Sequence, residues 1–497
     1  QLFFHPHDAT RHFCLSRGLG DVYKRQLITG ATGYIGGRLI PRLLANNIKV
    51  RILVRDKTKI DGKSWYNKVE IFEGDLTKLE SLSGLCDGID QAFYLVHSMT
   101  NSKEYIELDR LSARNFVKIA KENIQHVIYL GGISPKEKNI SEHLSSRIEV
   151  GRILSKSLPT TELRAGPIIG SGSASFEMLR HLSEKLPVMV APKWINNIVR
   201  PISVRDVLKY LVLSLDKQPC LQIDIGSDPM SFKDLMLKYC DYRGLKRYIF
   251  PVPVLAPGLA ARWIGLVTPI TNSLASPIVK SVINNIEGDI SLASSHYPEI
   301  KTLNYTDSIK SAFDKTKKEF IETSWNKQKI KFDYRLSQQR GRFEEIRIAK
   351  TDATCEQIFS IFKSLGGANG WKAWNSMWNI RKYIDILLGG KICSEPDREN
   401  LKVGSDFDCF KIEKLDSNKK ILLKMTLKTP GEAWLKFEAI DDITHSYIVM
   451  TAIFEPKGIW GYLYWYSILP LHKLIFKDLM GSLKKECDMI NKTPAKI

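Results

Sequence analysis

Three glycines, Gly30, Gly33 and Gly36, follow one another at steps of three residues in the segment QLITGATGYIGGRLIPRLL (26–44). A short apolar stretch precedes them, and apolar residues recur at helical spacing after them. Glycines let a backbone approach a diphosphate closely, and the following helix N-terminus offers unpaired N–H groups. The segment therefore predicts a nucleotide-cofactor site, although a tight strand-to-helix turn without a ligand has the same pattern. The cofactor-binding residues expected in this loop are Gly30, Thr32, Gly33, Tyr34, Ile35 and Gly36.

Position 55 discriminates between two cofactors. The segment KVRILVR (49–55) is typical of a buried strand, and its last residue is Arg55. NAD-binding domains carry an acidic residue at about this place, which accepts a hydrogen bond from the ribose 2′-hydroxyl. A guanidinium can instead pair with a 2′-phosphate through two parallel hydrogen bonds. The sequence therefore favours NADP, with NAD as the alternative because Asp56 is the next residue.

Strands and helices alternate after this point. The apolar segments 69–76, 91–99 and 126–134 are expected to be strands, and 108–124 has helical periodicity. Such alternation is typical of a parallel sheet that is covered by helices on both faces. We therefore expect an α/β Rossmann fold with a doubly wound parallel sheet.

Five motifs occur in a fixed order: TGATGYIG, EGDL, YLVHSM, LRAGPIIG and RPISVRDVLKYL. Together they resemble the atypical or extended short-chain dehydrogenase/reductase superfamily, of the NmrA-like and epimerase/dehydratase type, over residues 27–290. The resemblance implies an NAD(P)(H)-binding domain with a substrate pocket shaped by 163–170 and 200–207. The further cofactor contacts that it implies are Asp75 and Leu76 beside the adenine, and Val96 and His97 along the cofactor.

The residues that perform proton transfer in this superfamily are replaced. Catalytic members carry Tyr-x-x-x-Lys after the fifth strand, whereas the only equivalent spacing here is His143-x-x-x-Arg147. Histidine can transfer protons near neutral pH, with a group titrating near 6–7, and Arg147 can still bind the cofactor ribose or phosphate. Ser134 matches the place of the superfamily's Ser or Thr. We expect catalytic roles for Ser134, His143 and Arg147; the alternative is an amphipathic helix capped by Ser141.

A second unit is expected over 333–497, after a lysine-rich helix and linker at 291–332. Its order is a strand, a helix, several alternating strands and a long final helix at 467–490. This order predicts an α+β helix-grip fold of the START or polyketide-cyclase kind. Three of its segments resemble a C-terminal domain of unknown function that is fused to such reductases. Six of the ten tryptophans occur here, where they either fill the core or line an apolar ligand cavity.

One run in this unit is unusually aromatic. GIWGYLYWYSILPLHKLIF (458–476) places five tryptophans and tyrosines within seven positions. If this run is a helix, the rings cover nearly every face, so that some must face a cavity or the outside. The alternative is a strand up to about Tyr466 with alternate residues buried. The expected partner is a small apolar substrate or lipid-like ligand, with contact to an anionic membrane surface as a further expectation.

Composition limits the remaining classes of function. The formal net charge is +19, from 73 basic and 54 acidic residues, which suits anionic partners or a solvated basic surface; we expect no nucleic acid. The eight cysteines include no C-x-x-C pair, so zinc ribbons and thioredoxin chemistry are excluded, no metal site is expected, and the cysteines are expected to be reduced. No apolar run reaches the ~20 residues of a membrane span. A cytoplasmic place, in part against the inner face of a membrane, is expected.

Residues 1–26 have neither a helical nor a strand period, nor the plan of a signal peptide. We interpret them as a foreign segment, which leaves only Leu27 and Ile28 of the first strand. The domains expected are therefore 27–290 with a small substrate lobe, the linker 291–332, and 333–497. The whole predicts an NADP(H)-dependent reductase or isomerase of an apolar carbonyl, lipid or quinone-like compound. The alternative is a non-catalytic NADP(H)-binding sensor or assembly protein.

Overall fold

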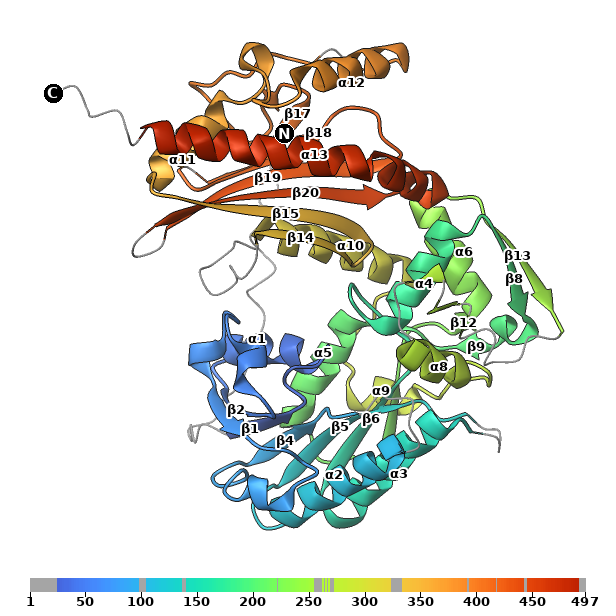
Figure 1. The fold of residues 1–497 in the computed structure, drawn as a ribbon. Coiled ribbons are helices and arrows are strands. Elements are labelled where there is room, and N and C mark those ends of the chain that lie inside the picture. The colour runs from blue at the N-terminus through green and yellow to red at the C-terminus, as the bar shows by residue number, and fades with distance from the viewer. Residues whose placement is uncertain are drawn as a thin grey trace, which may run out of the picture.

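Two units, each built on a seven-stranded sheet, make up the molecule (Figure 1). The structure is a computed structural model. The residues that it describes are 25–97, 104–135, 140–220, 222–253, 262, 264–265, 267–268, 272–322, 333–390, 393–416, 418–441 and 445–490.

The N-terminal sheet is parallel throughout and has the order β11-β6-β5-β4-β1-β2-β3. Its strands are β1 (Arg25–Thr29), β2 (Lys49–Val54), β3 (Glu70–Glu73), β4 (Gln91–Tyr94), β5 (His126–Gly132), β6 (Thr160–Ala165) and β11 (Gln222–Ile225). Helices α1 (Gly36–Ala45) and α5 (Val204–Leu213) pack on one face of this sheet. Helices α2 (Glu104–Ala120) and α3 (Glu142–Ser157) pack on the other. The expected doubly wound Rossmann architecture is therefore confirmed.

The first strand is longer than expected. Arg25 and Gln26 belong to β1 and pair in register with Lys49 and Val50 of β2. The strand accommodates a polar residue because the Gln26 side chain is buried and its Nε2 donates to Gln91 Oε1 at 3.1 Å. The segment interpreted as foreign therefore overlaps the sheet by these two residues.

A smaller lobe lies between the two sheets (Figure 1). Its helices are α4 (Ala174–Lys185), α6 (Phe232–Arg243) and α8 (Asn272–Ser281), followed by α9 (Ser291–His296) and α10 (Tyr305–Glu322). Its short strands are β7 (Ile168–Ile169), β8 (Val188–Pro192), β9 (Ile198–Val199), β10 (Ile202–Ser203), β12 (Met230–Ser231) and β13 (Tyr248–Val252). The expected linker after 322 lies outside the described residues, as does most of the apolar stretch 252–270.

The C-terminal sheet is antiparallel, with the order β14-β15-β20-β19-β18-β17-β16. Its strands are β14 (Tyr334–Gln339), β15 (Arg342–Thr351), β16 (Asp406–Phe407), β17 (Phe410–Asp416), β18 (Lys420–Met425), β19 (Gly431–Asp441) and β20 (Ser446–Pro456). Its helices are α11 (Cys355–Ser364), α12 (Asn375–Leu387) and α13 (Gly458–Ile490). Helix α13 lies along the sheet and buries Leu479 and Leu483 against it (Figure 1). The α+β expectation is confirmed.

Helix α13 begins nine residues before the expected position 467. The alternative of a strand up to Tyr466 is therefore wrong. The aromatic run is the first part of the helix, where Tyr462 and Trp465 are buried and Trp460 and Tyr466 are exposed. The rings thus diverge around the helix, as one turn every 3.6 residues requires.

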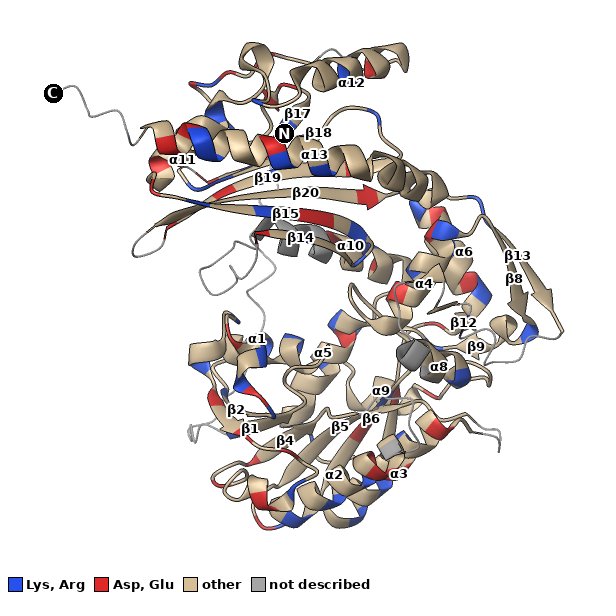
Figure 2. Cartoon of the chain, in the orientation of Figure 1, with Lys and Arg blue, Asp and Glu red and all other residues tan. Residues whose placement is uncertain are grey.

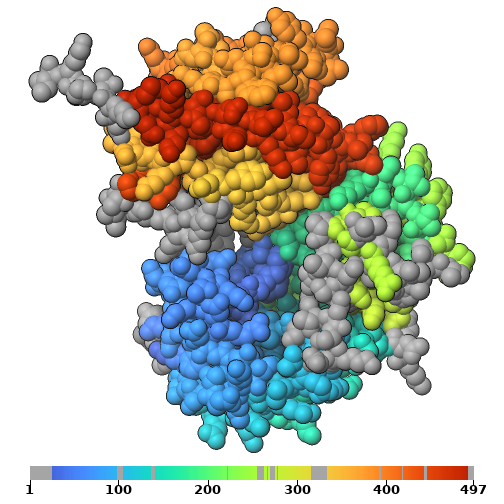
Figure 3. All heavy atoms as spheres, in the orientation of Figure 1, coloured from blue at the N-terminus to red at the C-terminus, as the bar shows by residue number. Residues whose placement is uncertain are grey.

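The two units meet over α4 and the start of α13, as the space-filling view shows (Figure 3). The buried carboxylate of Glu184 on α4 accepts hydrogen bonds from Tyr239 OH at 2.9 Å and Arg243 Nε at 2.7 Å. Its other oxygen accepts from the backbone N–H of Gly458 at 2.7 Å. An acid at the N-terminus of α13 is favoured by the helix dipole. Because Glu184 is buried and fully bonded, it fixes the end of α4 to the start of α13.

Two sequence expectations about cysteines and membranes can be compared with the fold. Cys393 and Cys409 form a disulfide, which differs from the expectation that the cysteines are reduced. Sixteen positions separate the two residues, so no short cysteine motif reveals the pair. Among the described residues, no helix combines the length and the apolar character that spanning a membrane requires.

Candidate functional site

The glycine loop joins β1 to α1 in a turn that admits no side chain at two of its positions. Gly30 has φ of +77°, and a Cβ there would lie 2.6 Å from the carbonyl oxygen of Leu95. A Cβ at Gly36 would lie 2.4 Å from the carbonyl oxygen of Gly30. These glycines are therefore required by the turn itself, whatever the loop binds.

The helix that follows supports an anion-binding role for the loop. No side chain caps the N-terminus of α1, and its first turn contains no acidic residue. The first N–H groups of a helix have no partner within it, and they carry partial positive charge. The loop and α1 therefore fit the diphosphate of a nucleotide cofactor.

A cavity of about 510 Å³ opens above this loop, at the C-terminal edge of the parallel sheet. It brings together nine of the residues expected from the sequence, from three separate segments of the chain. They are Gly30, Gly33, Tyr34, Ile35, Gly36, Val96, His97, His143 and Arg147.

The other expected site residues do not line this cavity. Ser134 follows β5 and is half-buried. Asp75 accepts from the N–H and hydroxyl of Thr77 at 3.0 and 2.9 Å, and Leu76 is buried. Thr32 is exposed. The adenine contacts implied for Asp75 and Leu76 stay predictions.

Three side chains form a relay that ends at the cavity. Asp109 Oδ2 lies 3.0 Å from His97 Nδ1, and His97 Nε2 lies 3.1 Å from His143 Nδ1. The hydroxyl of Ser146 donates to the same carboxylate oxygen at 3.2 Å. If Asp109 is ionised, His97 donates to it through Nδ1, and His97 Nε2 accepts from His143. This assignment leaves Nε2 of His143 as a proton acceptor.

Both histidines are held in their neutral form. Burial lowers the pKa of His143 to about 3, and the nearby His97 and the positive charge of Arg147 lower it further. Burial also lowers the pKa of His97, although its hydrogen bond to Asp109 acts in the opposite direction. The expectation that His143 titrates near 6–7 is therefore wrong, because desolvation disfavours the imidazolium form.

Arg147 is anchored by the strand beside it. Its Nη2 donates to the carbonyl of Leu130 at 2.6 Å, and its own carbonyl accepts from Tyr129 OH at 3.0 Å. The Nε atom of Arg147 is enclosed and has no hydrogen-bond partner. The guanidinium therefore has donor capacity left for a group in the cavity. The helix is also capped by Ser141, whose hydroxyl accepts from Leu144 N at 3.3 Å, as the alternative interpretation required.

Arg55 and Asp56 follow one another at the end of β2, and they differ in whether their charged groups are already hydrogen-bonded. Arg55 is exposed. Asp56 caps the 3₁₀ turn that follows, and its Oδ1 accepts from Thr58 N at 2.9 Å and Thr58 Oγ1 at 2.6 Å. Those hydrogen bonds lower the pKa of Asp56. This carboxylate is therefore engaged locally, whereas the guanidinium of Arg55 extends into solvent.

Sequence reasoning missed Asp109 and Ser146 in the relay. Asp109 is on α2 and Ser146 on α3, and they meet only because both helices pack on the same face of the sheet. Their one local signal is a polar residue on the buried stripe of an amphipathic helix, where both are at most 4 % exposed.

The C-terminal unit reaches the rim of the same cavity. Arg340 and Gly341 form the two-residue turn between β14 and β15, both with positive φ. A Cβ built at Gly172, which lines the cavity, would lie 3.6 Å from Arg340 Nε. A Cβ at Gly341 would lie 2.6 Å from Arg180 of α4. The turn therefore packs tightly on the start of α4.

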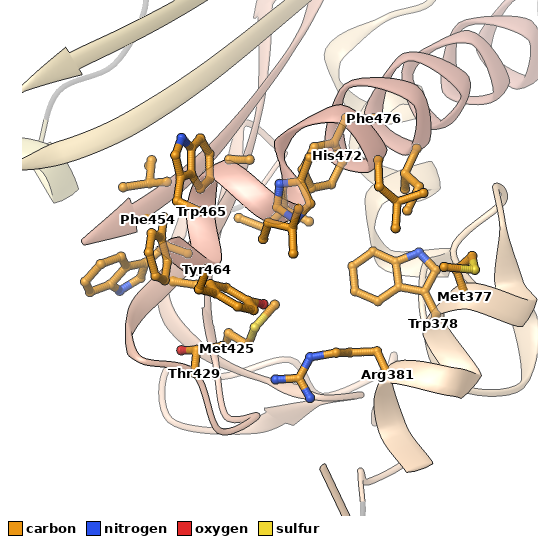
Figure 4. Close-up of a pocket in the computed structure, with 18 of the residues that line it drawn as sticks. Met377, Trp378, Arg381, Met425, Thr429, Phe454, Tyr464, Trp465, His472 and Phe476 are labelled. Atoms are coloured by element: carbon orange, nitrogen blue, oxygen red, sulfur yellow. The ribbon is translucent and has the colours of Figure 1, made fainter. Parts of the chain in front are cut away.

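A second cavity, of about 230 Å³, lies inside the C-terminal unit between the sheet, α12 and α13 (Figure 4). Its walls are mostly aromatic and aliphatic. Trp378 and Arg381 of α12 face Phe454 and Tyr464 across it. The aromatic run of α13 thus contributes to a cavity, as one expectation had it.

Polar atoms in this second cavity lack partners. Nδ1 of His472 is enclosed and has no hydrogen-bond partner. The same holds for the indole Nε1 atoms of Trp378 and Trp465. Burial alone lowers the pKa of His472 to about 4, so its imidazole is neutral. Enclosed polar atoms without a partner carry a desolvation cost, which a ligand with a polar group can remove.

Taken together, the parallel sheet, the glycine turn, the uncapped helix and the cavity define the N-terminal unit as an NAD(P)H-binding Rossmann domain. Residues 30–154 match the family described as NAD(P)H-binding. Residues 338–479 match the family described as protein of unknown function (DUF2867). No protein with a curated description matches the chain.

Several solved structures are similar to part of the chain. One is a nucleoside-diphosphate-sugar epimerase from Staphylococcus aureus, with 18% identity and a TM-score of 0.46, which covers 57% of this chain and 99% of its own. Another is UDP-glucose 4-epimerase from Thermotoga maritima, with 14% identity, a TM-score of 0.46 and coverage of 59% and 99%. A third is the Bordetella bronchiseptica enzyme WbmG in complex with NAD, with 13% identity, a TM-score of 0.46 and coverage of 60% and 95%.

Proposed function

We propose that the chain is an NADP(H)-dependent oxidoreductase that reduces or isomerises an apolar carbonyl compound, of the lipid or quinone-like kind. The observation that carries this proposal is the Asp109–His97–His143 relay, which ends in the cavity above the glycine loop. A bound nicotinamide would accept or supply a hydride in this cavity. The chain itself must then move one proton to or from the substrate oxygen or carbon.

His143 can move that proton although its own imidazolium is disfavoured. Its Nε2 takes the proton from a substrate hydroxyl or from a carbon next to a carbonyl, while its Nδ1 proton passes to His97 Nε2. The positive charge then resides on His97, 3.0 Å from the carboxylate of Asp109, where an opposite charge favours it. In the reducing direction His97 first takes a proton from solvent, and the same shifts then run backwards and deliver that proton to the substrate. Arg147 lies beside this path and orients the bound cofactor or substrate oxygen through its free donor.

NADP is proposed over NAD because Arg55 is free and Asp56 is not. The Asp56 carboxylate is held by Thr58, so its acceptor capacity for a ribose hydroxyl is reduced. The exposed guanidinium of Arg55 is available for a 2′-phosphate.

The test is turnover of NADPH with a panel of aldehydes, ketones and quinones. We expect His143→Ala to lower the rate about 10²-fold or more, as removal of a general acid or base does. In this reducing direction the relay must be protonated before it can donate, and burial lowers the pKa of His143 to about 3, so the wild-type rate should rise steadily as the pH falls from 8 to 6. His445→Ala, in the C-terminal unit, is the matched control and should retain the wild-type rate.

A rate that is unchanged in His143→Ala would contradict this proposal, as would a wild-type inflection near pH 6–7 that the variant loses. Binding of NADPH with no turnover of any compound would favour the second candidate. That candidate is a non-catalytic NADP(H)-binding sensor or assembly protein. It is supported by the replacement of the Tyr-Lys pair by His143 and Arg147.

For the C-terminal unit, we propose a helix-grip fold that holds the apolar compound. The support is the order of elements: strand β15, helices α11 and α12, the strands β16 to β20, and then α13 across the sheet. The apolar cavity between the sheet and the long helix gives this unit a place for a ligand. Its role would be to deliver or shield the compound that the N-terminal unit converts.

We also propose that α12 contacts an anionic lipid surface. Its outer side exposes a run of apolar residues, and Leu387 at its end is 86% exposed. The other large apolar residues exposed on or just after α12 are Ile380, Tyr383, Ile384, Ile386 and Leu388. An exposed apolar patch of this kind marks an interaction site, and the chain's net charge of +19 favours an anionic surface.

A further inference from the structure

We propose a binding site for a phosphate group in a pocket between α1, α5 and α10, separate from the cofactor cavity. The pocket has a volume of about 110 Å³. Three arginines line it: Arg38 and Arg42 of α1, and Arg205 of α5. Figure 2 marks basic residues on both of these helices.

The charges of the three arginines are not balanced by an acidic side chain in the described part of the chain. Among the residues that the structure describes, no carboxylate forms an ion pair with Arg38, Arg42 or Arg205. Instead, they act on one another: burial lowers the pKa of Arg42, and the positive charges of Arg38 and Arg205 lower it further. Like charges that are gathered without a counter-charge are costly. An anion in the pocket would remove that cost.

Donors in the pocket are only partly used by the protein. Arg38 donates to the carbonyls of Tyr34 at 3.2 Å and Ser171 at 3.0 Å, and Arg42 donates to the carbonyl of Arg38 at 2.9 Å. The Nε atom of Arg38 and the hydroxyl oxygen of Ser171 are enclosed and have no hydrogen-bond partner. Arg38, Ser171 and the other two arginines line the same pocket, and the remaining guanidinium N–H groups have donor capacity left.

The size and the donors favour a tetrahedral oxyanion. A volume of about 110 Å³ is large enough for a small anion such as phosphate. Planar guanidinium groups bind phosphate oxygens in pairs. Ser203, Ser308 and Ser311 also line the pocket. Free phosphate and the phosphate of a monoester or lipid headgroup share this chemistry.

The pocket is distinct from the expected place of the cofactor. It lies on the side of α1 that packs against α5, and Arg55, the expected 2′-phosphate residue, does not line it. The two cavities share only Tyr34 among their lining residues. Because Ser308 and Ser311 come from α10, a bound phosphate would join α10 to α1 and α5 of the Rossmann domain.

The experiment is calorimetric titration of the full chain with inorganic phosphate, with and without saturating NADPH. The test variant is Arg42→Gln/Arg205→Gln, and the control is Arg114→Gln/Arg152→Gln, which removes the same charge from two exposed arginines of α2 and α3. We expect phosphate to bind the wild type and the control equally, and the test variant at least tenfold more weakly. NADPH should leave phosphate binding unchanged in the wild type.

Three results would overturn the site: no phosphate binding to the wild type, equal binding to the test variant, or loss of phosphate binding when NADPH saturates the chain. The last would place phosphate in the cofactor cavity. Circular dichroism and the affinity for NADPH, which should be the same in all variants, show that the test variant is folded. Flotation with vesicles that contain phosphatidic acid separates the sources: binding that depends on Arg42 and Arg205 identifies a lipid headgroup, and its absence identifies a soluble phosphate.

Discussion

The cavity above the glycine loop and the cavity in the C-terminal unit differ in how their polar atoms are hydrogen-bonded. In the N-terminal cavity, Asp109, His97 and His143 are linked by hydrogen bonds of 3.0 and 3.1 Å. In the C-terminal cavity, the buried nitrogens of His472 and Trp378 have no partner. A connected relay suits proton transfer, whereas isolated polar atoms in an apolar wall suit recognition of a ligand that carries one polar group.

The two cavities also differ in which parts of the sequence form them. The floor of the first is a contiguous loop whose glycines are fixed by close approach of the backbone. The walls of the second come from α12, the sheet and α13, separate elements that meet only in the folded unit. A loop motif is visible to local sequence reasoning, and a wall assembled from distant elements is not.

The largest expected effect is on the affinity for NADPH, from a substitution in the glycine loop of the first cavity. Gly30→Ala puts a Cβ 2.6 Å from the carbonyl oxygen of Leu95, at a φ of +77°. The turn must shift, and the N–H groups that face the diphosphate shift with it. We expect the affinity for NADPH to fall by about a hundredfold or more, which is ~2.7 kcal/mol or more. Fluorescence titration with NADPH measures it.

Gly37→Ala is the matched control for this prediction. Its Cβ would lie 3.4 Å from the carbonyl oxygen of Ala31, which is an ordinary contact. This variant should bind NADPH as the wild type does. Equal affinity of Gly30→Ala and the wild type would mean that the loop does not hold the cofactor.

The fold of each unit was more predictable than its site. Apolar periodicity predicted the parallel sheet, because a buried strand is locally apolar and its flanking helices are amphipathic. The exceptions are polar positions that a distant partner satisfies, such as Gln26 with Gln91. The relay needed Asp109 of α2 and His143 of α3 to meet, and no local pattern contains that contact. The protonation of His143 was wrong in the sequence expectation for the same reason, since the burial that lowers its pKa is a property of the packed cavity.

A substitution in the second cavity is expected to have an intermediate effect, on the affinity for a quinone. We expect His472→Phe to bind 1,4-naphthoquinone up to tenfold more weakly, because one net hydrogen bond is worth about 0.5–1.5 kcal/mol. Naphthalene, which has no carbonyl, should bind the variant and the wild type alike. Calorimetry on the full chain without NADPH measures both. His472→Asn keeps a polar group and should restore part of the quinone affinity; a parallel loss for both compounds would mean that His472 only packs.

The same two variants of His472 also test how the stability of the chain depends on pH. The pKa of His472 is about 4 in the folded chain and about 6.5 in an unfolded one. Between these values the unfolded state binds the proton and the folded state does not. Stability from this group is therefore present above pH 6.5 and lost as the pH falls toward 4. From pH 6.5 to 5, the free energy of unfolding should fall by up to about 2 kcal/mol more in the wild type than in either variant; equal falls would contradict the pKa shift.

The smallest expected effect concerns the choice of cofactor at the edge of the first cavity. Arg55 is exposed, so a phosphate contact there is weakened by solvent, and we expect Arg55→Gln to lower the affinity for NADPH about tenfold, or ~1.4 kcal/mol. The affinity for NADH should stay the same, since NADH has no 2′-phosphate for the guanidinium to bind. Lys49→Gln, at the other end of β2, controls for the loss of a positive charge. If both variants lose the same affinity for NADPH, general electrostatic attraction accounts for the preference, and Arg55 has no special contact. If the wild type binds NADPH and NADH equally, the preference for NADP is wrong. NAD would then be the alternative, with Asp56 as its ribose contact, and the hydrogen bonds of Asp56 to Thr58 would have to open when the cofactor binds.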